Sequence, residues 1–160
     1  MGTCPLQASA ALAASPSAAQ VFGTAGEVPF ALHGRVYYIP ENTETLPDFS
    51  RLRPVGTISA TKLDIQPQSF TAGFPGVTDR FEWFAVDYKG RISLPEGGTF
   101  TFRLTSDDGA KLFIDGQEVI DNDGIHGPGS IDGEVELAAG IHEIRVPYFQ
   151  GPREEIALEV

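Results

Sequence analysis

Cysteine is almost absent from this 160-residue sequence, because Cys4 is the only one. No internal disulfide can form, and no cysteine-based zinc site can be built. The three histidines, His33, His126 and His142, do not show the spacing of zinc ligands either. The chain must therefore fold around an ordinary hydrophobic core, and its 41% content of hydrophobic residues is typical of a chain that folds.

Positive charge is also scarce. Lys and Arg number 11 against 22 Asp and Glu, which gives a formal net charge of -11. This balance repels phosphate backbones and anionic lipid headgroups, so we expect neither nucleic acid nor a membrane surface as a partner. Carboxylates are the ligands that hard cations such as calcium prefer, although most of these acids serve solubility alone.

Long apolar runs and catalytic signatures are missing too. No stretch approaches the roughly 18 to 20 apolar residues that span a bilayer, so no membrane span is expected. The Gly-x-Ser-x-Gly motif of serine hydrolases does not occur, since Pro128 and Asp132 stand where the segment around Ser130 would need glycines. A carboxylate pair for glycoside hydrolysis meets only in three dimensions, and the sequence nominates none. We expect a protein that is not an enzyme.

The N-terminal segment differs in composition from the rest. Residues 6–20, LQASAALAASPSAAQ, resemble the end of a signal peptide or a flexible secretory linker, although the first basic residue is Arg35. We therefore expect residues 1–29 to be a leader remnant or flexible linker, and residues 30–160 to form the domain. The same segment indicates an exported protein, either secreted, cell-surface or periplasmic.

From residue 30 onward the pattern is that of an all-β domain. In residues 99–106, Phe100, Phe102 and Leu104 alternate with polar residues, which predicts a half-buried antiparallel strand. The buried set is expected to be Phe100, Phe102, Leu104, Leu112, Ile144, Val146 and Tyr148. Strands are expected at 35–39, 55–61, 80–86, 90–94, 99–106, 110–114, 117–120, 133–138, 142–149 and 154–160.

Turn residues support the same fold class. Asp115-Gly116 stands between two expected strands and is the pair that two-residue hairpins favour. The proline-rich stretch 40–80 is expected to form long loops over one end. Many short strands separated by such turns predict an antiparallel β-barrel or sandwich.

Two adjacent aspartates, Asp107 and Asp108, end one expected strand and are followed by Gly109. One interpretation is a turn, with Gly109 at positive φ. The other is a cation site, because a cis peptide between the aspartates would aim both carboxylates at one ion. Gln150 and Gly151 could supply neutral oxygens to such an ion, although an ordinary hairpin turn explains their segment equally well.

Residues 119–129, VIDNDGIHGPG, superficially resemble a calcium loop of the EF-hand type. With Asp121 as the first position, His126 stands where the sharp turn demands glycine, so the match fails. We expect Asp121, Asn122 and Asp123 to bond their own backbone in a turn, and His126 to pack or bond locally.

Several motifs together resemble the PA-fourteen domain family. They are Trp83-Phe84, a glycine before the Phe-x-Phe strand, Ser106-Asp107-Asp108-Gly109, Leu112-Phe113-Ile114-Asp115-Gly116 and Leu137-x-x-Gly140-x-His142. The resemblance covers at least residues 80–160 and implies a β-barrel or sandwich module of adhesins, glycosidases and toxins.

In sugar-binding members of that family, consecutive aspartates joined by a cis peptide hold a calcium ion that binds sugar hydroxyls. The resemblance therefore implies Ca²⁺ at Asp107 and Asp108, with Gln150 and Gly151 in the place that completes the metal site. It also implies that Asp107, Asp108 and Gly109 form the sugar-binding site.

The expected function is a non-catalytic, calcium-dependent carbohydrate-binding module of an exported protein that includes other domains. Two alternatives stay open: a structural or spacer module that binds nothing, and an accessory domain of a glycoside hydrolase. No motif in residues 40–80 indicates which sugar would be bound.

Overall fold

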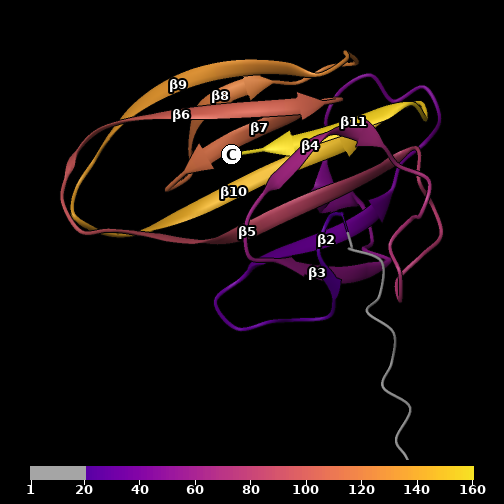
Figure 1. Cartoon of the computed structure of the whole chain (residues 1–160), viewed down its shortest axis with the longest axis horizontal. Coiled ribbons are helices and arrows are strands. Elements are labelled where there is room, and N and C mark those ends of the chain that lie inside the picture. Colours follow the sequence, from indigo (N-terminus) through magenta and orange to yellow (C-terminus); the bar gives the residue numbers. More distant parts are fainter. Residues whose placement is uncertain (1–20) are drawn as a thin grey trace, which may run out of the picture.

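The computed structural model describes residues 21–160, and β-strands make up most of this part of the chain (Figure 1). The elements are β1 (Thr24–Ala25), β2 (Leu32–Tyr38), the 3₁₀ turn η1 (Phe49–Arg51), β3 (Gly56–Ala60), β4 (Asp64–Ser69), β5 (Phe84–Leu94), β6 (Gly98–Asp107), β7 (Ala110–Ile114), β8 (Gln117–Asn122), β9 (Gly129–Leu137), β10 (Gly140–Gln150) and β11 (Glu155–Glu159). No helix in residues 21–160 has the length and hydropathy that crossing a membrane requires.

The strands form two antiparallel sheets. One has seven strands in the order β1-β3-β2-β5-β10-β7-β8, and the other has four in the order β4-β11-β6-β9. The centre of the seven-stranded sheet is the long pair β5 and β10, which lie side by side from Phe84↔Gln150 to Leu94↔Gly140 (Figure 1). Because the two sheets remain separate, the fold is an antiparallel β-sandwich, one of the two expected architectures, and not a closed barrel.

The core lies between the sheets and is built from the inward-facing residues of each strand. Of the expected buried set, Leu104, Leu112, Ile144, Val146 and Tyr148 are confirmed. Phe100 and Phe102 are only half-buried, so that part of the prediction is wrong. Phe102 lines a hollow at the edge of the core, which leaves part of its side chain exposed.

Two segments were misjudged from sequence. β4 lies within the region expected to be loops, and it contains Pro67. This is possible because β4 is an edge strand, where a missing N–H costs no ladder hydrogen bond. β5 is a single strand, although two shorter strands were expected on either side of Asp87 to Lys89.

The folded domain begins before residue 30. Phe22 is buried against Phe70, Phe74 and Phe84, and β1 pairs with β3. Residues 21–29 are therefore part of the sandwich, and the expected boundary at residue 30 is wrong. The rest of the expected leader or linker, residues 1–20, lies outside the described residues.

The Asp115-Gly116 hairpin is confirmed. Both residues have positive φ, 49° and 79°, and they connect β7 directly to β8. This backbone twist suits a two-residue loop between antiparallel strands.

Candidate functional site

Asp107 and Asp108 lie where the chain passes from one sheet to the other. Asp107 is the last residue of β6 in the four-stranded sheet, and β7 of the seven-stranded sheet begins at Ala110. The peptide bond between the two aspartates is cis, as expected. Both residues are buried, with 6% and 4% of their surface exposed.

The carboxylate of Asp108 is held by three N–H groups. The backbone N–H of His126 donates to Oδ1 at 3.1 Å, and that of Gly151 donates to Oδ2 at 2.8 Å. The side-chain amide of Gln150 also donates to Oδ2, at 3.3 Å. Two loops, β8–β9 and β10–β11, therefore fix this carboxylate in one orientation.

The carboxylate of Asp107 is in a different situation. The main-chain oxygen of Asp107 accepts a hydrogen bond from the buried Tyr148 hydroxyl at 2.6 Å. Its carboxylate, by contrast, receives no hydrogen bond or ion pair from any residue in 21–160. A buried carboxylate without a partner is costly, and a bound cation is one way to compensate it.

The electrostatics agree with this geometry. Burial first, and then the neighbouring charge of Asp108, raise the pKa of Asp107 to about 6. Burial also raises the pKa of Asp108, against the opposing effect of the N–H groups of Gly151 and His126. The pair is therefore short of positive charge at neutral pH, which a cation would supply.

His126 is the basic side chain beside the pair. Its two ring nitrogens face the carbonyl oxygens of Asn122 at 3.0 Å and Gly127 at 2.8 Å, and only the doubly protonated ring can donate to both. Burial alone would lower the pKa of His126, but these hydrogen bonds and the charges of Asp108 and Asp107 raise it. The expectation that His126 bonds locally is confirmed.

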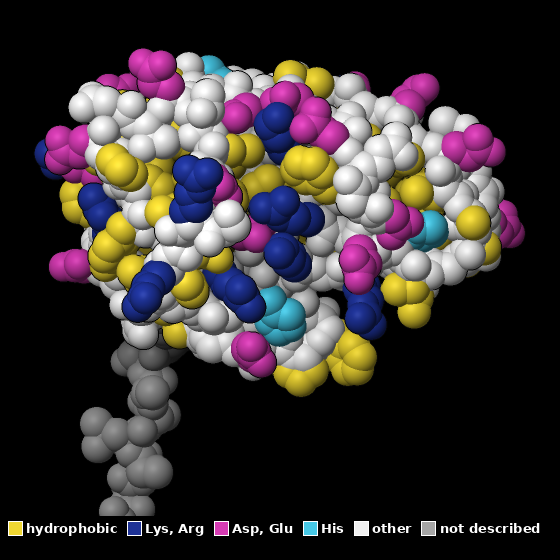
Figure 2. Space-filling view, turned by 180° about the vertical axis from the view of Figure 1, so that it is seen from behind, with side chains coloured by type: hydrophobic (Ala, Val, Ile, Leu, Met, Phe, Trp, Pro, Cys, Tyr) yellow, Lys and Arg dark blue, Asp and Glu magenta, His cyan; other side chains and the backbone are white. Residues whose placement is uncertain are grey.

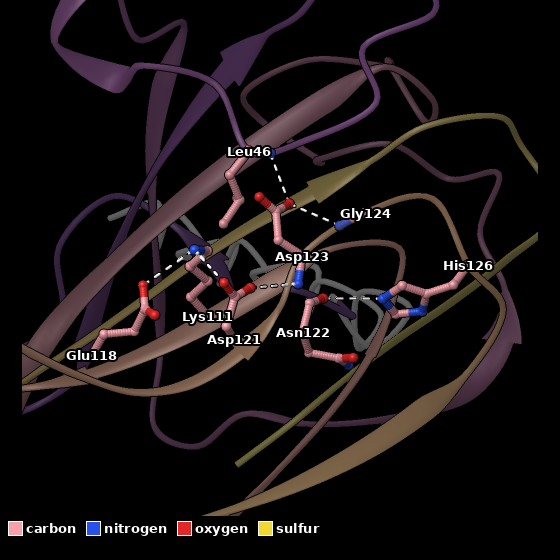
Figure 3. Close-up of polar contacts among 8 residues, drawn as sticks. All are labelled: Leu46, Lys111, Glu118, Asp121, Asn122, Asp123, Gly124 and His126. Carbon is pink, nitrogen blue, oxygen red and sulfur yellow. Dashed lines mark hydrogen bonds and ion pairs between the residues drawn. The ribbon is translucent and has the colours of Figure 1, made fainter.

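Asp121 and Asn122 end β8, and a loop follows them to His126; Figure 3 shows the contacts of this segment. The expected local bonding holds for Asp121, whereas the Asn122 side chain donates to Ser106 and Gly129. Asp121 accepts from the Asp123 backbone N–H at 3.1 Å and pairs with Lys111 at 2.7 Å. Asp123 accepts from the backbone N–H of Leu46 at 2.8 Å, so this segment also anchors the long loop before β3 (Figure 3). Its carboxylates are thus engaged within the protein.

Gln150 and Gly151 lie beside Asp108, but not in the way expected of metal ligands. The Gln150 side-chain oxygen lies 2.5 Å from the Tyr148 hydroxyl, whose single proton it shares with the Asp107 carbonyl, and the Gly151 carbonyl accepts from the Trp83 backbone N–H at 3.0 Å. Both residues present N–H groups to Asp108. In this geometry they position Asp108, and each of their oxygens already has one hydrogen-bond donor within reach.

Position 109 has no room for a side chain, so glycine is required there. Its φ is not among the positive values, so the expected turn with Gly109 at positive φ does not form. A Cβ at Gly109 would come within 2.4 Å of the Phe149 ring and 2.7 Å of the Asp123 carboxylate. Glycine therefore allows the β6–β7 turn to pack against β10 and the β8–β9 loop.

An open hollow of about 300 Å³ adjoins the aspartates. Its principal lining residues are Asp107, Asp108, Ile125, His126, Glu154 and Glu155. Gln150 and Gly151 do not line it. The sequence analysis did not indicate Glu154 and Glu155, although they follow Gln150 and Gly151 by only a few residues.

The donors suit calcium better than zinc. In residues 21–160 no group of three or more His, Cys, Asp or Glu is placed to hold a metal ion. A site at the aspartate pair would combine two carboxylates with neutral oxygens, which hard cations accept and zinc sites seldom use. The unpartnered carboxylate of Asp107 fits such an ion.

The family model of the PA14 domain matches residues 35–160. The chain belongs to the PA14 domain family. The match begins in β2 and includes every strand from there to β11, and with it Asp107 and Asp108. No curated protein matches this chain.

Solved structures share the fold of this PA14 domain at low sequence identity. A "PA14 sugar-binding domain from RTX adhesin" is 22% identical, with a TM-score of 0.62, over 79% of this chain and 86% of that one. The epithelial adhesin 9 A domain from Candida glabrata, solved in complex with Galb1-3GlcNAc, is 14% identical, with a TM-score of 0.56, over 85% and 84%.

A third match shows the fold within a longer chain. An "anti-sigma factor domain-containing protein" is 23% identical, with a TM-score of 0.63, over 81% of this chain. This chain spans only 41% of that protein. At these identities the three structures show the fold alone.

Proposed function

We propose that this PA14 domain binds carbohydrate through a calcium ion held by Asp107 and Asp108. The observation that carries the proposal is that Asp107, a residue only 6% exposed, has a carboxylate without a protein partner in residues 21–160. The sugar-binding adhesin domain and the adhesin–disaccharide complex among the matching structures support the same ligand class.

Asp107 and Asp108 would contribute to the calcium site in different ways. Asp107 offers its free carboxylate to the ion, and Asp108 offers the oxygen lone pairs that its three N–H partners leave unused. Bound calcium supplies open coordination positions that two adjacent sugar hydroxyls can fill. Ile125 and Glu154 line the hollow in which the sugar would sit.

The protein makes few other contacts in so open a hollow, so a single site binds weakly. We expect a millimolar dissociation constant for a simple sugar, about -4 kcal/mol. Repeated copies or clustered proteins would raise the avidity without new contacts. Such a module is non-catalytic and belongs to an exported protein, where it acts beside other domains.

Calcium titration by calorimetry tests whether the domain binds calcium at Asp107 and Asp108. The wild-type domain should bind one calcium ion, and Asp107→Asn should abolish this binding while the circular dichroism spectrum is unchanged. Glu96→Gln, in the loop between β5 and β6, is the control for a lost negative charge and should bind calcium normally. Absence of calcium binding by the wild type would support the spacer alternative.

A further inference from the structure

The outer face of the seven-stranded sheet is covered over only part of its area. Leu46, Phe49 and Leu52, from the loop before β3, pack over the row formed by Tyr37, Ala85 and Phe149. In the next row Asp87 and Pro147 are also buried, and the rows from His33 and Lys89 onward carry exposed or half-buried side chains. Figure 2 looks onto a face where Lys and Arg side chains gather.

Basic side chains stand in register across these rows. His33 lies opposite Lys89, and Lys89 lies opposite Arg145. In the next row Arg91 lies opposite Glu143. Like charges directly opposite one another destabilise a sheet, and the carboxylate of Asp87, which contacts both side chains, offsets part of the repulsion between Lys89 and Arg145.

The local carboxylates do not neutralise this cluster. Asp87, 4% exposed, bonds Arg145 at 2.6 Å and lies 3.4 Å from Lys89. Within residues 21–160, neither Arg35 nor Arg91 has a carboxylate within 4.0 Å. The protein carries 22 acidic residues against 11 basic ones, so two arginines without such a partner on one face are unexpected.

A hollow of about 500 Å³ opens among these side chains. Its polar and aromatic lining comes from His33, Lys89, Arg91, Phe113, Glu143 and Arg145. The volume lies within the range of ligand sites, roughly 300 to 1,000 Å³. It shares no residue with the hollow beside Asp107 and Asp108.

We propose that this basic hollow binds a polysaccharide that carries carboxylate or sulfate groups. Lys89 and Arg91 supply charge for the anionic groups. Within residues 21–160 no carboxylate lies within 4.0 Å of Arg91, and its cross-strand neighbour Glu143 lines the same hollow. The half-buried Phe113 offers an aromatic ring to the apolar face of a sugar, with the Arg145 guanidinium 5.6 Å from the ring centre.

The negative charge of the rest of the protein favours a polysaccharide over other polyanions as the ligand. A net charge of -11 repels a duplex nucleic acid or a flat anionic membrane, both of which would extend beyond the hollow. A sugar chain with spaced charges can meet the cluster locally and leave the acidic surroundings in water. An acidic peptide lacks the flat apolar face that Phe113 would accept.

The test measures binding of polygalacturonate and dextran sulfate by calorimetry at low salt. A chelator is present, so that no calcium is available to the proposed site at Asp107 and Asp108. The variant Lys89→Gln/Arg91→Gln removes two lining charges and leaves Asp87 its bond to Arg145. The matched control is Lys62→Gln/Arg103→Gln, which removes one Lys and one Arg from around the other sheet. Both variants have the same net charge.

We expect wild-type binding of at least one charged polysaccharide and none of uncharged dextran. The Lys89→Gln/Arg91→Gln variant should bind at least tenfold more weakly, and the control should bind within twofold of the wild type. Equal losses in the two variants, no wild-type binding, or equal binding of polyglutamate or phosphatidylglycerol vesicles would overturn the proposal. Because calcium is chelated, these outcomes are independent of the function proposed for Asp107 and Asp108.

Discussion

The backbone N–H of Gly151 donates to Oδ2 of Asp108 at 2.8 Å, although the two residues are 43 positions apart in the chain. The Gly151 carbonyl accepts from the Trp83 N–H in turn. The loop between β10 and β11 is thus held at one side by the start of β5, and it holds Asp108 at the other. The orientation of Asp108 depends on this loop.

Replacing Gly151 tests that dependence. In Gly151→Ala, the new Cβ would lie 2.6 Å from Ile125 and 3.1 Å from the Asp108 carboxylate, so Asp108 must move. We expect a loss of about 1 to 3 kcal/mol in unfolding free energy and at least tenfold weaker calcium binding. Gly98→Ala, where a Cβ meets nothing within 4 Å, is the control. Unchanged calcium affinity in Gly151→Ala would show that Asp108 does not need this loop.

The Tyr148 hydroxyl provides a second test, because it links the Asp107 carbonyl to the Gln150 side chain. Tyr148→Phe leaves those buried oxygens without a donor and should cost about 1 to 3 kcal/mol of stability. Calcium binding should weaken as well. Tyr88→Phe is the matched control, since its buried hydroxyl donates to the Phe22 carbonyl far from the aspartates in sequence. It should lose stability but keep its calcium affinity, and equal calcium losses would contradict the account.

The pKa of Asp107 predicts an unusual pH dependence in calcium-free protein. Burial raises the pKa of Asp107 from 3.8 to about 6, so the folded state binds the proton more tightly than the unfolded state. The resulting stability is fully present below about pH 4 and is lost as the pH rises through about 6. Above that pH, Asp107→Asn should be more stable than the wild type, by less than the roughly 3 kcal/mol of an unscreened shift because the carboxylate borders an open hollow.

Urea denaturation in chelator at pH 4.5 and pH 8 measures this difference. The advantage of Asp107→Asn should be small at pH 4.5 and large at pH 8. The same advantage at both pH values would show that the ionised carboxylate of Asp107 is not strained by its surroundings.

The core offers a test of the fold itself. Leu104 is fully buried, so Leu104→Ala should cost about 2 to 5 kcal/mol. Phe102 lies two residues earlier on the same face of β6 but lines an open hollow, so Phe102→Ala should cost less than the 3 to 5 kcal/mol typical of a buried phenylalanine. Thermal or urea denaturation of the two variants gives the comparison. A larger loss for Phe102→Ala would mean that this end of the sandwich is closed.

Sequence patterns were sufficient for most of the strands, although not for β1 or β4, and the expected cis bond between Asp107 and Asp108 is present. Alternation placed Leu104, Val146 and Tyr148 in the core, because period two is a property of any half-buried strand. Alternation could not reveal that Phe102 lies beyond the closed part of the sandwich. That depends on which strands from the other sheet reach it.

The role of Gln150 shows a second limit. The segment was identified correctly as a neighbour of the aspartates, but the sequence does not indicate which atoms face them. In the structure the side-chain amide N–H of Gln150 faces Asp108, because the side-chain oxygen of Gln150 faces the Tyr148 hydroxyl. Phe22 was missed for a related reason: a single aromatic residue beside an alanine-rich segment gives no periodic signal.

The central claim is that sugar binding requires calcium at Asp107 and Asp108. Saturation-transfer difference NMR with a panel of mono- and disaccharides, recorded first with calcium and then after chelation, tests it most directly. The account predicts sugar signals with calcium, their loss after chelation, and no signals in Asp107→Asn under either condition. Signals that survive chelation, or that persist in Asp107→Asn, would contradict it.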